Sequence, residues 1–256
     1  MRKALLAPLC LWLFAPLPAQ SQDVVLLAHR ATYELRLEGR APGGGIEAAH
    51  GLLAIDMADG CDSWDVRQAI ALTLVRDESQ VTTVSEFDSQ EAKDGGWYRF
   101  EDDTSHVPGG RDVTAGQASA APDRAGRVHV NQPETAEVGL PAGTLFPTAH
   151  VVAVLRGAMA GERLISHVLY DGTDGTLIYD VSTAIGRGET DDASGLRVWP
   201  VRLAYFVHGS LAELPELEIS ARLREDGVAQ GLTFDYGGFV LGAVLQSLEP
   251  LPPPDC

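Results

Sequence analysis

Cysteine is the residue type that points most directly to chemistry in this chain, which has three cysteines among 256 residues. Cys10 lies in an N-terminal apolar segment, which leaves Cys61 and Cys256 in the rest of the chain. Two cysteines in an oxidising compartment most simply form a disulfide. Residues 251–255 are proline-rich and extended, and a bond to Cys61 would hold them against the domain. We therefore predict a disulfide between Cys61 and Cys256; a nucleophilic Cys61 is the alternative.

Motifs for phosphate binding, serine hydrolysis and zinc binding are missing from the sequence. There is no Gly-Lys-Ser/Thr and no Gly-x-Ser-x-Gly. The segment from Asp171 to Gly175 lacks the acidic ladder and distal glutamate of a calcium loop, and we interpret it as a turn. The seven histidines stand singly, without metal-ligand spacing: His29, His50, His106, His129, His150, His167 and His208. We predict no metal, no cofactor and no enzymatic activity; a pair of carboxylates assembled in three dimensions for hydrolysis is the alternative.

The N-terminus has the features of a secretory signal peptide. Arg2 and Lys3 precede an apolar run that ends at Leu17-Pro18-Ala19, a small-residue cleavage pattern. Prolines interrupt the run, and it is shorter than the ~20 residues that a membrane span needs. We predict that residues 1–20 are removed after export to the periplasm, with cleavage after Ala19, and that residues 21–256 form a single domain.

The exported chain is strongly acidic. Without Arg2 and Lys3, 17 basic residues remain against 36 acidic ones. Such a charge repels phosphate backbones and anionic lipid headgroups. We therefore predict no nucleic-acid partner and expect proteins, apolar ligands or cations instead. The same charge also serves solubility.

Most of the chain has the patterns of β-strands. Apolar and polar residues alternate in residues 31–37 and 217–223, which places one set of side chains on a buried face. The doubled turn signal in residues 171–175 predicts a hairpin. Pro200, within a long apolar stretch, predicts a bulge or an edge position, and residues 101–126 show little periodicity. We count at least ten strands and predict a mainly β fold, a large curved antiparallel sheet.

One helix is expected after Pro147, which suits a first helical turn, and Gly161 is a natural C-terminal stop. The helix would carry an apolar face at three-and-four spacing: Val151, Val152, Val154, Leu155 and Met159. These five residues are the candidate core helix or pocket. If the helix plugs the concave face of the sheet, Val152→Asp should unfold the domain; if it lies at a mouth, the pocket behind it could take an acyl chain.

Five short motifs together resemble the envelope integrity protein B family of alphaproteobacteria, over nearly the whole chain after the signal peptide. They occur in this order: Ala28-His29-Arg30-Ala31-x-Tyr33-x-Leu35, Gly60-Cys61-Asp62-x-Trp64, Thr144-Leu145-Phe146-Pro147-Thr148, Tyr170-Asp171-Gly172 and Asp255-Cys256. The resemblance implies a spiralling antiparallel sheet that encloses a helix, similar to periplasmic lipoprotein carriers. It also implies a disulfide between the two matching cysteines, Cys61 and Cys256, and no enzymatic activity or cofactor.

These observations leave two main hypotheses about function. The first is a non-enzymatic periplasmic factor for cell-envelope integrity that acts through protein partners; the resemblance makes a TPR-repeat envelope protein one such partner. The second is a carrier that holds a lipid or a lipoprotein acyl chain in the concave face of the sheet. The sequence does not identify the partner, the ligand or the oligomeric state.

Overall fold

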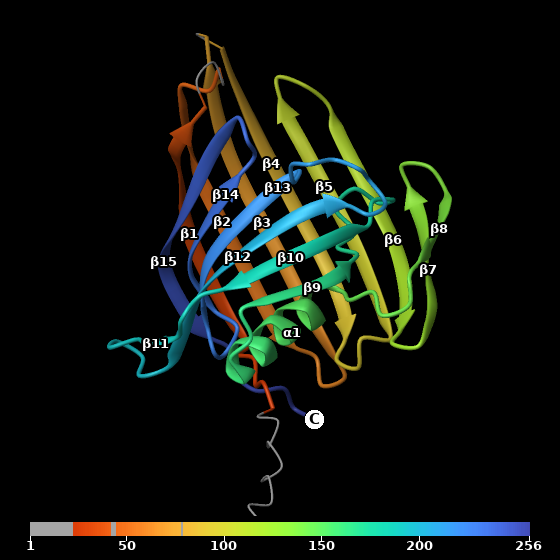
Figure 1. The fold of residues 1–256 in the computed structure, drawn as a ribbon. Coiled ribbons are helices and arrows are strands. Elements are labelled where there is room, and N and C mark those ends of the chain that lie inside the picture. The colour runs from red at the N-terminus through yellow and green to blue at the C-terminus, as the bar shows by residue number, and fades with distance from the viewer. Residues whose placement is uncertain (1–22, 42–44, 78) are drawn as a thin grey trace, which may run out of the picture.

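Fifteen β-strands and one α-helix make up the part of the chain that the structure describes, and every strand belongs to one antiparallel sheet (Figure 1). The structure is a computed structural model that describes residues 23–41, 45–77 and 79–256. The predicted signal peptide, residues 1–20, lies outside these residues. In chain order the elements are β1 (His29–Arg40), β2 (Ala48–Asp59), β3 (Ser63–Arg76), β4 (Ser79–Ala92), β5 (Trp97–Val107), β6 (Arg111–Ala121), β7 (Arg124–Gln132), β8 (Ala136–Leu140), α1 (Pro147–Ala160), β9 (Leu164–Leu169), β10 (Tyr179–Ile185), β11 (Glu189–Thr190), β12 (Arg197–Val207), β13 (Leu217–Arg224), β14 (Ala229–Asp235) and β15 (Phe239–Pro250).

The sheet curves round on itself without closing into a barrel. Its strand order is β8-β7-β6-β5-β4-β3-β2-β1-β15-β14-β13-β12-β10-β9, so β8 and β9 are the two ends of the path. In Figure 1, β10, β12 and β13 cross in front of β3 and β4, which gives the sheet a spiral form. The predicted mainly β class, with a large curved antiparallel sheet and one helix, is confirmed.

Strand β1 shows how the alternation in the sequence becomes an inner and an outer face. Ala31, Tyr33 and Leu35 are buried, and the residues between them point outward. The register sets Tyr33 opposite Leu53 on one side and Leu245 on the other. The Tyr33 hydroxyl donates a hydrogen bond of 2.8 Å to the carbonyl oxygen of Ala229 on β14. A buried tyrosine thus ties β1 to a strand with which it shares no ladder.

Residues 101–126, which show little periodicity in the sequence, form regular strands or parts of strands in β5, β6 and β7. Their inner face carries small or polar side chains, such as Asp102, Thr114 and Gly116. These residues interrupt the alternation of apolar and polar residues by which a strand is recognised in a sequence. Gly116 is required here, because a Cβ on it would lie 2.7 Å from the ring of Phe100. The strands are therefore specified by pairing with their neighbours more than by their own hydrophobicity.

The prediction of a bulge at Pro200 is wrong. The predicted edge position is correct only in that Pro200 lies just past the end of the ladder between β12 and β10. β12 lies inside the sheet between β10 and β13, and Pro200 pairs with Arg222 without a register shift. The ladder to β10 ends at the Ile185–Val201 pair, and the next contact is the Gly186 N–H, which donates 2.7 Å to the Pro200 carbonyl. The Pro200 nitrogen faces that same side, just past the end of the ladder, so its missing N–H costs no strand pairing.

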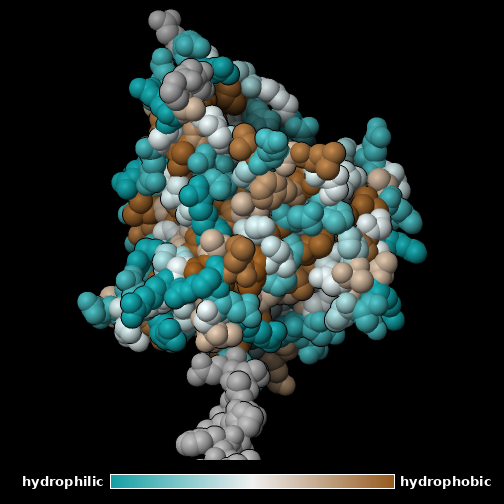
Figure 2. Space-filling model, in the orientation of Figure 1, coloured by the Kyte–Doolittle hydropathy of each residue, from teal (hydrophilic) through white to brown (hydrophobic). Residues whose placement is uncertain are grey.

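The inner face of the sheet is filled in separate clusters. At the β5–β8 end, Tyr98 stacks on Phe146, with ring centroids 5.1 Å apart, and Phe100 and Tyr170 complete an aromatic group. On the face shown in Figure 2, hydrophobic residues lie in patches between hydrophilic ones. Within the described residues, the 14-residue α1 is the sole helix, and no helix there has the length and apolar character needed to cross a membrane.

Candidate functional site

The most distinctive place in the fold is the end of the sheet that α1 closes, below β9 in Figure 1. The predicted bounds of the helix are confirmed, from Pro147 to a left-handed C-cap at Gly161. Its predicted apolar face divides by depth. Val154 and Leu155 are 2% and 0% exposed, whereas Val151, Val152 and Met159 are half-buried. All five pack in one cluster with side chains of β10, β12 and β13 that include Ile185, Trp199, Val201 and Leu223.

The N-terminus of α1 is capped by a residue from a distant strand. Phe146 occupies the N-cap position with an extended backbone and provides no side-chain acceptor. Glu91, at the end of β4, accepts hydrogen bonds from the backbone N–H groups of Thr148 (2.6 Å) and Ala149 (2.7 Å). Only 2% of Glu91 is exposed, and this burial raises the pKa of its carboxyl while the two hydrogen bonds lower it. The carboxylate also lies where the helix dipole favours negative charge.

Sequence reasoning missed Glu91, although the sequence holds one signal for it. A helix that begins Phe-Pro-Thr, with no Ser, Thr, Asp or Asn at the cap position, needs an acceptor from elsewhere. Nothing in the sequence identifies which of the 36 acidic residues supplies it.

Two histidines that are far apart in the sequence face each other between α1 and β9. The rings of His150 and His167 lie edge to face, with centroids 5.5 Å apart. Burial lowers the pKa of His150 to about 4 and also lowers that of His167, so both rings are neutral near pH 7. His150 Nε2, His167 Nδ1 and the hydroxyl of Thr183 have no hydrogen-bond partner among the described residues. No group of three or more potential metal ligands occurs in the described part of the chain.

A hollow of about 390 Å³ lies beside the N-terminal half of α1. Val152 and Arg156 line it from the helix, and Trp64 and Lys93 line it from β3 and the β4–β5 turn. The Lys93 ammonium lies 4.9 Å from the centre of the Trp64 ring and bonds to Asp59. Val152 therefore lies at an opening lined by both cationic and acidic side chains, while Leu155, one turn away, is enclosed by the core.

The two cysteines meet at this same end of the molecule. Cys61 and Cys256 are placed as a disulfide pair, with Cα atoms 6.1 Å apart and a sequence separation of 195. Cys61 follows β2 in a left-handed turn conformation (φ 63°), and its N–H donates to the Asp59 carboxylate. The Leu251 N–H donates to the Ala28 carbonyl at 2.8 Å, so the C-terminal segment is held near β1 before it reaches Cys61.

Known proteins resemble this chain over most of its length. The profile of the EipB-like family matches residues 20–252, which is nearly the whole chain. This chain belongs to the EipB-like family. The resemblance found in the sequence motifs is thereby confirmed.

The chain is similar to a Brucella abortus protein and to a Brucella abortus crystal structure. The chain is 26% identical to the cell envelope integrity protein EipB of strain 2308, in a match that covers 92% of this chain and 88% of that protein. It is also similar to the crystal structure of a β-barrel-like protein of the domain of unknown function DUF1849. That match has a TM-score of 0.83 and 25% identity, and it covers 90% of this chain and all of the other.

Proposed function

We propose that this protein is a non-enzymatic periplasmic factor that supports cell-envelope integrity by binding protein partners. The proposal rests on its membership of the EipB-like family and on its similarity to a relative named for cell envelope integrity. It includes export by the signal peptide and a Cys61–Cys256 disulfide formed in the periplasm, an oxidising compartment.

One observation carries the proposal: α1 is fixed into the end of the sheet, by the Glu91 cap at its N-terminus and by Leu155 in the core. Two buried tyrosines, Tyr98 and Tyr170, also serve as structural links. The hydroxyl of Tyr98 donates to the Asp171 carbonyl at 2.8 Å, and that of Tyr170 donates to the Gly175 carbonyl at 2.6 Å. Groups committed in this way hold the sheet together and leave the outer surface to interact with other molecules.

A second candidate, the carrier of a lipid or acyl chain, is favoured by a different observation. Several apolar side chains on the inner face of the sheet are only half-buried, among them Ile70, Leu72, Leu203 and Phe234. An acyl chain laid against them would remove further apolar surface from water, at roughly 25 cal/mol per Å². Mass spectrometry of lipids extracted from the purified mature protein tests this candidate, and a stoichiometric lipid would support it.

The experiment for the main proposal is deletion of the gene in the organism that encodes it, followed by growth on an envelope-disrupting detergent. We expect sensitivity that is reversed by the exported protein and not by one that lacks residues 1–20. Photo-crosslinking residues placed over the outer surface should then give adducts with envelope proteins, and a TPR-repeat protein is the partner class to examine first. Normal detergent resistance after deletion, or the absence of protein adducts at every position, would refute the proposal.

A further inference from the structure

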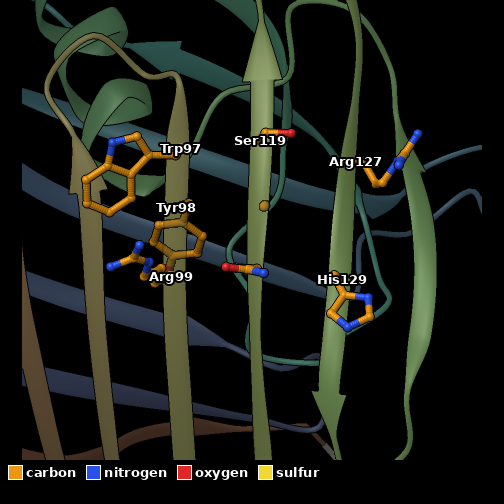
Figure 3. A pocket seen from close by; sticks show the side chains of 8 residues that line it. Trp97, Tyr98, Arg99, Ser119, Arg127 and His129 are labelled. Atoms are coloured by element: carbon orange, nitrogen blue, oxygen red, sulfur yellow. The ribbon is translucent and has the colours of Figure 1, made fainter.

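A second surface lies on the outer face of β5, β6 and β7 (Figure 3). Their neighbours Tyr98, Ala118 and Val128 are buried, so strand alternation sends the intervening side chains outward. Six outward residues surround a hollow of about 330 Å³, and we call them the indole–arginine surface: Trp97, Arg99, Gln117, Ser119, Arg127 and His129.

The strand register arranges these residues in two rows across the sheet. One row is Trp97, Ser119 and Arg127, and the other is Arg99, Gln117 and His129. Figure 3 shows Trp97 and Arg99 on one side and Arg127 and His129 on the other, with the short Ser119 between them. Strands two places apart in a sheet are separated by about 10 Å, which is the width of one extended peptide.

This surface carries two arginines, Arg99 and Arg127. Neither Arg99 nor Arg127 forms an ion pair with a carboxylate of the described residues. Five other outward arginines of the sheet are each paired with a carboxylate: Arg30, Arg67, Arg111, Arg202 and Arg222. In a chain of net charge −17, this hollow is lined by two guanidinium groups and by no carboxylate of the described residues.

Trp97 adds an apolar contact beside these charges. Its side chain is 37% exposed, and the Arg99 guanidinium lies 5.1 Å from the centre of its ring. Tryptophan and arginine are enriched at the centres of protein interfaces. A guanidinium presents a planar fork of donors that matches a carboxylate.

We propose that the indole–arginine surface binds an extended acidic segment of a protein partner. Its carboxylates would pair with Arg99 and Arg127, and an apolar side chain of the segment would lie on Trp97. The neighbouring hollow on β4 and β5 has mixed charge, with Asp88 and Glu101 beside Arg67 and Arg99, whereas no carboxylate of the described residues lines this one. This inference rests on the proposed function and names the chemistry of the partner.

The binding test uses the mature, disulfide-bonded protein and a fluorescent glutamate-rich peptide of about ten residues that contains leucine, a length close to that of β6. A peptide with glutamine in place of glutamate is the charge control. We expect Arg99→Glu with Arg127→Glu to weaken binding by about 10-fold or more, because both charge pairs become repulsive. Trp97→Ala should weaken it by about 5-fold.

The matched control is Arg187→Glu with Arg197→Glu, which makes the same charge change at exposed arginines at the other end of the sheet. It should bind the peptide as the wild type does. Equal weakening in both double variants would show an effect of net charge alone and overturn the inference. Binding of anionic phospholipid vesicles through Arg99 and Arg127, with no binding of the peptide, would also overturn it.

A cellular measurement separates this inference from the proposed function. A photo-crosslinker at Ser119 should give an adduct whose partner peptide is acidic, and a crosslinker at the exposed Gln246 on β15 should not. If protein adducts form only away from residue 119, the inference is wrong and the proposed function stands. If no surface position gives a protein adduct, both are wrong.

Discussion

The carboxylate of Glu91 lies 2.6 Å from the backbone nitrogen of Thr148, which follows it by 57 positions in the chain. This bond, with its companion to Ala149, makes β4 the cap of α1. The bond joins the helix to β4, where Glu91 pairs with Trp64 of β3, close to the turn that contains Cys61. The start of the helix and this end of the sheet therefore stabilise each other.

The first prediction concerns this cap. Glu91→Ala should lower the free energy of unfolding by about 2–4 kcal/mol, because it leaves two helix N–H groups without an acceptor in a buried place. Glu91→Gln should cost less, since its amide oxygen still accepts one bond. Urea unfolding measures both. Glu86→Gln on the outer side of β4, in an exposed pair with Arg67, is the control and should cost under about 1 kcal/mol.

The second prediction concerns the pH dependence of stability at His150. Its pKa in the folded protein, about 4, lies below the unfolded value of 6.5. The unfolded chain therefore binds the proton first, and stability present above pH 6.5 is lost as the pH falls toward 4, at about 1.4 kcal/mol per pH unit. His150→Gln should reduce this slope and leave the part that His167 contributes, since burial lowers the pKa of His167 as well. Exposed His50, changed to Gln, should keep it; equal slopes for wild type and His150→Gln would contradict the assignment.

The third prediction concerns the disulfide. The native oxidised protein should show no thiol reactive without reductant. Either Cys61→Ser or Cys256→Ser should lower the melting temperature and expose the C-terminal segment to proteolysis, with a loss of up to about 5 kcal/mol in the chain-entropy model for so long a loop. Asp255→Ser, which leaves the bond in place, is the control. Two titratable thiols in the native protein would show that the pair is reduced.

The fourth prediction tests which part of α1 is enclosed in the core and which part lies at the opening of the hollow. Leu155→Asp places a charge in the core without a partner and should unfold the domain, at a cost of several kcal/mol. Val152→Asp should cost much less, because Val152 is half-buried at the hollow that Lys93 and Arg156 also line. Circular dichroism and thermal melting measure both. Equal unfolding by the two substitutions would mean that the hollow closes in solution.

The sequence alone determined the parts of this protein that depend on local pattern. Alternation in residues 31–37 identified a strand with one buried face, because successive side chains of a strand point to opposite sides. Pro147 and Gly161 set the limits of the helix, since each acts on the backbone at its own position. The family motifs, too, could be recognised without coordinates.

Only the tertiary structure decided which distant residues meet. Alternation indicates the face on which Trp97 or Arg127 lies, but the row that joins them through Ser119 depends on the register of three strands. Helical spacing identified an apolar side of α1 but not that Leu155 is enclosed while Val152 lines a hollow. Glu91 and Thr148 meet because the sheet curves back over the helix, and such a contact between segments far apart in the chain leaves no periodic trace in the sequence.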